Sequence, residues 1–361
     1  MTALTTGFAL KTPEAPSTVA PPIKRGSDYS RLTRLVREAG LLRPRLGYYA
    51  VAIGLNAALF IGGWVAFFII GQSWIILLVA VLMAISSAQL GFLGHEIGHR
   101  QVFRTRRVSN AVGLVVGNLA IGLGMGWWND KHNRHHSRPN NVDHDPDVGP
   151  GALVWTPEQV ADRRGIARVW ARWQGRLFFP LLLLAGLNLH ISSFRALPRL
   201  SRNQRAVEFS LLTIHFVAYF AALVLVLSPG QAIAFFLVHK CLFGLYLGST
   251  FAPNHKGMPL LTGDDQYDYV RRQVLTSRNI KGSWFIDLAM GGLNYQIEHH
   301  LFPSMPRPAL RDSQAIVEQF CRDNSISYCQ TGLIESYRIA TGHLDVVGNF
   351  DTARGERQPV S

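Results

Sequence analysis

The sequence predicts an all-α integral membrane protein, with four transmembrane helices in two hairpins, interfacial helices and a cytoplasmic helical cap. Three observations predict this class. Hydrophobic residues make up 48% of the 361 residues, they gather in two long runs, and charged residues flank those runs. A soluble fold would scatter charges through runs of this length, so the composition favours a membrane protein.

The first apolar run contains no Asp, Glu, Lys, Arg or His from residue 46 to residue 94. A helix rises about 1.5 Å per residue and the hydrocarbon core is about 30 Å thick, so one crossing takes about 20 residues. The run is therefore too long for one span, and it breaks at Gly71-Gln72-Ser73. We expect a hairpin of spans at 47–70 and 74–94.

The second apolar run breaks at Ser228-Pro229-Gly230, which predicts a second hairpin of spans at 208–227 and 231–252. Lys240 would then lie near the middle of the membrane, where a charge is costly. Either this lysine faces the interior of the bundle, or the predicted boundaries are displaced by a few residues. The sequence suggests no function for it.

Charges orient the two hairpins. The turns carry none, whereas the opposite ends carry many basic residues. These are Arg43, Arg45, Arg100, Arg104, Arg106 and Arg107 for the first hairpin, and Arg195, Arg199, Arg202, Arg205 and Lys256 for the second. Basic residues prefer the cytoplasmic side, so both turns are predicted to face outward and both termini to be cytoplasmic.

Two further apolar stretches, 111–128 and 177–192, contain glycines and a proline, and we expect them to be interfacial or re-entrant. Residues 1–26 are rich in Pro, Thr and Ala and lack the apolar core of a signal peptide, which predicts a disordered leader. Residues 343–361 are expected to form a flexible tail. A single membrane domain would thus cover 27–342.

The net charge of +13 could indicate a nucleic-acid-binding protein. The arginines, however, flank the apolar runs instead of covering one polar domain, so we expect no nucleic-acid partner. The three cysteines form no CxxC motif and predict no disulfide framework.

Eight of the 13 histidines lie at or near the predicted cytoplasmic ends of the helices. They are His95, His99, His132, His135, His136, His255, His299 and His300. Two pairs are spaced i,i+4 and share a helix face. Neutral imidazole suits first-row transition metals. Eight imidazoles exceed the shell of one four- to six-coordinate ion, and adjacent pairs can serve two ions side by side, so the cap is predicted to hold a dinuclear metal site.

Two other functions use the same residues differently. HEIGH also fits the HExxH pattern, in which His95 and His99 would bind zinc and Glu96 would act as the base of a membrane-embedded metalloprotease. With one more histidine as the remaining zinc ligand, that reading leaves five of the eight histidines unused. A non-catalytic protein that stores or senses metal is the third possibility. The isolated His190, His215 and His239 are read as packed or hydrogen-bonded residues.

Three motifs, HEIGH (95–99), HNRHH (132–136) and QIEHH (296–300), resemble the histidine boxes of the membrane-bound fatty acid desaturases in type, order and spacing. The resemblance covers roughly residues 45–325 and includes the four-span layout. The glutamine of QIEHH and the following LFP resemble the front-end branch. The sequence contains no HPGG motif of a fused cytochrome domain, so a bacterial type with a separate electron donor is expected.

The resemblance implies a di-iron desaturase that uses dioxygen and two electrons to place a double bond in a long-chain acyl lipid or acyl thioester. All eight histidines would be catalytic metal ligands, with His255 as the additional one after the last span. Gln296, Asn254 and Asp145 would support the ligands. Trp127 and Trp128 would line the substrate's entrance or, more commonly for tryptophan, anchor the interface.

The implied partners are membrane lipid and an electron donor, ferredoxin-like or of cytochrome type, with its reductase. A lipid hydroxylase with the same di-iron site is the nearest alternative in chemistry.

Overall fold

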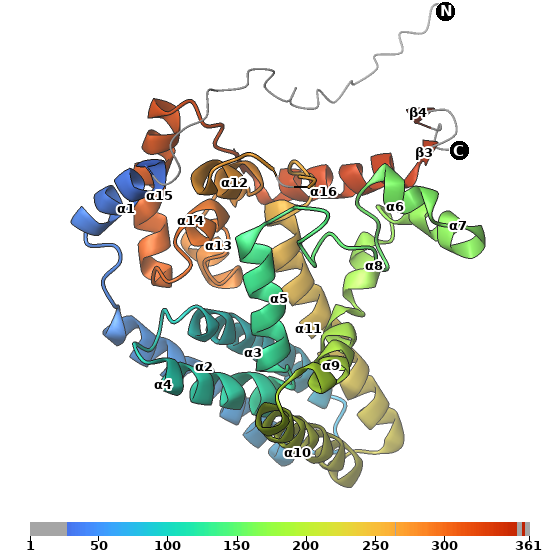
Figure 1. Ribbon diagram of the computed structural model, residues 1–361. Helices are drawn as coiled ribbons and strands as arrows, with labels where there is room; N and C mark the ends of the chain where they lie inside the picture. Colours follow the sequence, from blue (N-terminus) through green and yellow to red (C-terminus); the bar gives the residue numbers. More distant parts are fainter. Residues whose placement is uncertain (1–26, 264, 352–355, 358–361) are drawn as a thin grey trace, which may run out of the picture.

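The computed structural model describes residues 27–263, 265–351 and 356–357. The predicted leader, residues 1–26, lies outside the described residues. The described chain is mostly helical, with only two pairs of two-residue strands (Figure 1).

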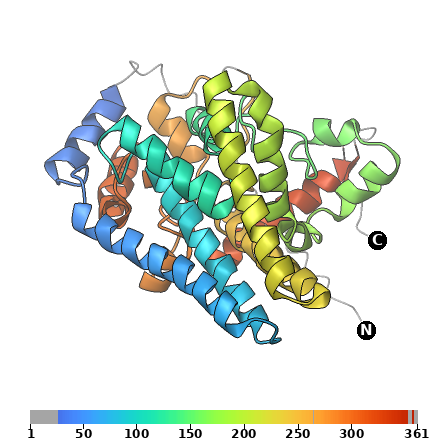
Figure 2. The ribbon, with the colours of Figure 1, turned by 90° about the horizontal axis from the view of Figure 1, so that it is seen from below.

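Within the described residues, four helices are long and apolar enough to cross a membrane: α2 (Leu46–Ile70), α3 (Ile76–Gly98), α10 (Arg202–Val226) and α11 (Pro229–His255). Figure 2 shows them from below as two hairpins, α2–α3 in blue to cyan and α10–α11 in yellow shades. Large apolar side chains on the outer faces are exposed, such as Ile69 at 79% and Leu225 at 83%. The predicted class of four-span helical membrane protein is therefore confirmed.

The helix bounds differ from the predicted spans by up to six residues. α3 continues to Gly98 and α11 to His255, whereas α10 already begins at Arg202. Hydropathy marks where side chains change polarity, but backbone hydrogen bonding continues beyond that point. As a result, His95 and His255 lie within the spanning helices themselves.

The predicted interfacial segment 111–128 is a broken helix. α4 (Arg106–Gly113) runs into a π-helix, η1 (Leu114–Ile121), and α5 (Met125–Ser137) follows after a bend of 110°. Gly122 permits the bend because its φ of 71° is left-handed. The Asn118 side chain accepts a hydrogen bond from the Met125 N–H at 3.1 Å. The bend directs α5, which carries HNRHH, toward the cap (Figure 1).

The segment predicted at 177–192 forms α8 (Phe178–Leu182) and most of α9 (Ala185–Ala196). α9 packs closely against α11 through two glycines. A Cβ on Gly244 would collide with the backbone nitrogen of Gly186. The backbones of α9 and α11 are therefore in direct contact at these two residues, and only glycine allows so close an approach.

The cap packs around one apolar cluster in which Leu32, Ile297 and Val317 are fully buried. Its helices are α1 (Ser27–Glu38), α6 (Pro157–Ala161), α7 (Gly165–Trp173), η2 (Leu197–Arg199), α12 (Tyr269–Leu275), α13 (Trp284–Ala289), α14 (Gln296–Leu301), α15 (Arg307–Asp323) and α16 (Leu333–Gly348). Of these, α6, α7, η2, α13 and α16 contribute no residue to that cluster. β1 (Asn279–Ile280) pairs in parallel with β2 (Gln330–Thr331), and β3 (Phe350–Asp351) pairs antiparallel with β4 (Glu356–Arg357).

The tail boundary at residue 343 was placed too early. α16 continues to Gly348, and its Leu344 and Val347 side chains are 0% and 4% exposed. Gly348, which follows them, is also buried and lies against the backbone of Ala171.

Lys240 faces the interior of the bundle. Its side chain is 2% exposed, and its ammonium nitrogen lies 4.6 Å from the centre of the Tyr219 ring. A cation over an aromatic face is stabilised most where water is excluded. The interior-facing alternative is the one that the structure supports.

Candidate metal centre

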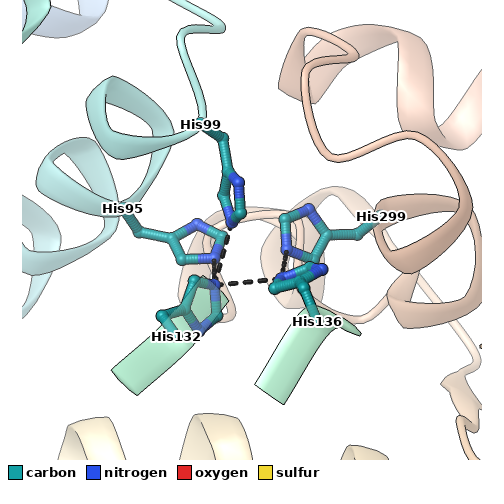
Figure 3. Close-up of side chains that lie close together, drawn as sticks. All are labelled: His95, His99, His132, His136 and His299. Atoms are coloured by element: carbon teal, nitrogen blue, oxygen red, sulfur yellow. Dashed lines mark hydrogen bonds between the residues drawn. The ribbon is translucent and has the colours of Figure 1, made fainter. Parts of the chain in front are cut away.

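Five histidines converge at the end of α3 that is predicted to face the cytoplasm. They are His95 of α3, His99 directly after the end of α3, His132 and His136 of α5, and His299 of α14. One ring nitrogen from each lies within 4.8 Å of all the others. Figure 3 shows the five rings pointing toward one another, with His132 in contact with its neighbours on both sides.

The other three histidines form a second group beside the first. His135, His255 and His300 come from α5, α11 and α14, and their ring nitrogens also lie within 4.8 Å of one another. The two groups touch, because the rings of His136 and His300 stack with centres 4.2 Å apart. All eight histidines singled out in the sequence are thus brought together.

The contacts between the rings suit metal ions better than hydrogen bonds. The Nε2 atom of His132 lies 3.0 Å from that of His95, 2.9 Å from that of His99 and 3.0 Å from that of His136. A neutral imidazole carries one N–H, so these nitrogens cannot all be paired by sharing protons. A cation placed among the lone pairs would satisfy them together.

Burial and the neighbouring imidazoles favour the neutral form of several of these rings, which is the form that binds a metal ion. Burial lowers the pKa of His99 to about 3. Burial first, and neighbouring imidazoles second, lower the pKa well below its usual range for His132, His136, His299 and His300. Neutral imidazole is the form that binds a metal ion.

Residues around the three-histidine group fix which nitrogen is free. His135 donates from Nδ1 to Asp145 Oδ2 at 2.8 Å, and the His255 Nδ1 lies 3.0 Å from the Thr276 carbonyl oxygen. The His300 Nδ1 lies 2.9 Å from Gln273 Oε1. When Nδ1 carries the proton, the Nε2 lone pair is available to a metal. The residues present therefore fit a metal ion at this group.

The predicted supporting residues all contact the site. Asp145 holds His135 as described. The Gln296 amide nitrogen lies 2.9 Å from the His255 Nε2, and the Asn254 amide donates to Gln296 Oε1 at 3.2 Å. Trp128 stacks on His132 with ring centres 4.4 Å apart. Trp127, in contrast, makes no ring contact with the eight histidines within the described chain.

Glu96 of HEIGH forms a salt bridge with Arg307 of α15. It is 2% exposed, and its partner side chain is also largely buried. In a HExxH protease the glutamate faces the metal-bound water. Here its carboxylate is neutralised by an arginine from the cap instead.

Sequence reasoning missed Gln273, Thr276 and Arg307. Gln273 also donates to the His136 carbonyl oxygen at 2.9 Å, so it joins both histidine groups. A buried glutamate in an apolar helix does predict a cationic partner, but it does not say which of the many arginines that partner is.

The fold and the site define a helical membrane protein with a buried histidine cluster that is compatible with a metal site. A model of the family described as "Fatty acid desaturase" matches residues 72–332. The chain belongs to the fatty acid desaturase family.

Three relatives illustrate the similarity. Acyl-lipid (9-3)-desaturase of Physcomitrium patens is 31% identical, over 89% of this chain and 61% of its own length. Delta(6)-fatty-acid desaturase fat-3 of Caenorhabditis elegans is 27% identical, over 89% of this chain and 75% of its own. Delta(5) fatty acid desaturase fat-4 of the same organism is 32% identical, over 69% of this chain and 58% of its own length. The chain thus spans about three-fifths of the first relative.

Proposed function

We propose that this protein is a di-iron fatty acyl desaturase that places a double bond in a long-chain acyl substrate. The observation that carries the proposal is the convergence of eight imidazoles in two touching groups, in a chain that belongs to the desaturase family. The relatives are named as desaturases that act at positions such as Δ5 and Δ6, which favours a double bond toward the carboxyl end of the acyl chain.

Two iron ions would be held, one by each group of histidines. The first group is His95, His99, His132, His136 and His299, and the second is His135, His255 and His300. The bound iron supplies the reductive activation of dioxygen. In the balanced reaction, two hydrogens leave adjacent methylene carbons, and dioxygen takes them up with two electrons and two protons to give two waters.

Residues around the metal centre would orient the ligating imidazoles and shield the acyl chain from water. Asp145, Thr276 and Gln273 hold three imidazoles in the tautomer that offers Nε2. Trp128 covers one side of His132, and it is the residue at which we place the acyl chain as it passes the site. An apolar wall there excludes water from the reacting carbons.

Electrons would come from a separate donor protein, ferredoxin-like or of cytochrome type. The net charge of +13 favours an acidic partner. The metal centre and both termini are assigned to the cytoplasmic side, on the basic residues that flank the spans. Reduction by an acidic donor should then slow as salt rises, and a rate independent of salt would count against it.

The test combines metal content with lipid analysis of a host that expresses the protein. Wild type should carry about two irons per chain and give new unsaturated acyl chains. His136→Ala should lose both properties. The matched control, His144→Ala, changes a histidine of the loop after α5 that belongs to neither group, and it should keep both. Hydroxylated acyl chains would instead indicate a lipid hydroxylase.

The metalloprotease is not favoured, because Glu96 pairs with Arg307. One zinc per chain that survives His136→Ala but not His95→Ala would nevertheless reverse this ranking and refute the desaturase proposal.

A further inference from the structure

A shallow groove of about 550 Å³ lies where α9 ends and α10 begins. Its apolar lining includes Phe194, Leu197 and Phe209, and its charged lining is Arg202 and Arg205. The groove is on the outside of the molecule, away from the histidines that line the metal centre. It sits at the polar end of a spanning helix, which is where lipid headgroups would meet the protein.

The arginines at this groove have no acidic partner. Arg195 and Arg199 precede it in the chain, so four arginines fall within 11 residues. All four are exposed, and within the described residues none of their side chains makes an ion pair.

The only acidic residue nearby in sequence, Glu208, points elsewhere. It is 4% exposed, accepts the Gly126 N–H at 3.0 Å, and accepts the Asn118 amide at 3.1 Å. The N-terminus of α10 adds the partial positive charge of a helix macrodipole. The groove therefore presents unpaired positive charge beside an apolar surface.

We propose that this groove binds the phosphate headgroup of an anionic glycerophospholipid, with the lipid's acyl chain against the apolar lining. Basic residues next to a spanning helix attract anionic lipids, and a cavity at the headgroup level makes the attraction local. The bound lipid is distinct from the acyl chain that reacts. The proposal depends on the membrane fold alone and not on the proposed reaction.

Occupancy of the groove should stabilise the metal centre. Arg205 lies one helical turn before Glu208 on α10, and Glu208 holds the first turn of α5 through Gly126. α5 carries three of the eight histidines. Ordering the start of α10 therefore supports the helix that bears the second histidine motif.

The test measures binding of phosphatidylglycerol to delipidated protein in nanodiscs of phosphatidylcholine, and the thermal unfolding midpoint in the same discs. Arg202→Gln with Arg205→Gln should weaken binding about 30-fold, at roughly fivefold for each arginine. It should also abolish the rise in midpoint that the anionic lipid gives. The matched control is Arg106→Gln with Arg107→Gln, two exposed arginines that begin α4 and are not part of the lining of this groove, and it should change neither.

Several outcomes would overturn the proposal. Equal losses in both pairs would mean general surface attraction, and unchanged binding in the groove pair would mean that the site lies elsewhere. Full competition by millimolar inorganic phosphate would indicate a free-phosphate site. Loss of acyl product with lipid binding intact would assign the groove to the reacting substrate. If the double variant fails to fold, the single variants still test the fivefold expectation.

Discussion

Replacing Asp145 by asparagine should selectively weaken metal binding at the three-histidine group. Asp145 is 2% exposed, and its carboxylate accepts three hydrogen bonds. Oδ2 accepts from the His135 Nδ1 and the Asn140 N–H, both at 2.8 Å, and Oδ1 accepts from the Asp147 N–H at 2.8 Å. An asparagine of the same size must turn its NH₂ toward at least one of these donors, so one hydrogen bond becomes a repulsion.

The size of the effect follows from the bond to His135. A hydrogen bond to a charged group contributes about 1.5–3 kcal/mol net. Loss of that amount corresponds to about 10- to 100-fold weaker metal binding, which is the usual effect of removing a carboxylate behind a ligating histidine. His255 and His300 keep their own partners, Thr276 and Gln273, so the group should be weakened and not abolished.

The assay is elemental analysis of purified protein during titration with a chelator. Asp145→Asn should fall from about two metals per chain to about one at chelator concentrations that leave wild type loaded. Asp130→Asn is the control, because the Asp130 side chain is 69% exposed on α5 and, among the residues that the structure describes, its ion pair is with Arg134. Two metals retained in Asp145→Asn with an unchanged chelator midpoint would refute the reasoning, and so would an equal loss in Asp130→Asn.

Two further predictions concern stability. Arg307→Gln should lower the free energy of unfolding by about 3–5 kcal/mol, because Glu96 would be left buried without its cation. Adding Glu96→Gln should recover part of that loss in denaturant titration, and no recovery would contradict the ion-pair argument. Gly244→Val should lower the thermal midpoint sharply because the new side chain would meet the Gly186 backbone, whereas Gly230→Ala, which meets nothing within 4 Å, should leave it nearly unchanged. Equal shifts for the two glycines would refute the close-packing argument.

The spans and the convergence of the histidines could be predicted from sequence because both depend on local signals. The first hairpin is predicted by the hydropathy of residues 46–94 and by the break at Gly71-Gln72-Ser73. The i,i+4 spacing of His95 with His99 already places both on one face of α3. The meeting of four separate helices is a less direct prediction. It rests on the expectation that histidines at the same membrane depth share metal ions, and the helices concerned are α3, α5, α11 and α14.

The remaining contacts could not be predicted because each joins residues far apart in the chain. Arg307 lies 211 residues from Glu96, and Gln273 lies 137 residues from His136. Composition offers many equivalent arginines and glutamines, and only the folded cap selects these two. The expectation for residues 111–128 left an interfacial and a re-entrant segment open, because an apolar segment looks the same in sequence whether it lies along the interface or turns by 110°.

The two histidine groups are chemically inequivalent. Each imidazole of the three-histidine group has an acceptor at Nδ1, and one of those acceptors is a carboxylate. In the five-histidine group, the Nδ1 atoms of His136 and His299 are buried without a partner. Five imidazoles come close to filling a six-coordinate shell, whereas three leave positions for a small molecule. If the proposed irons are bound, the three-histidine group would leave ligand positions open to dioxygen, and the five-histidine group would leave fewer.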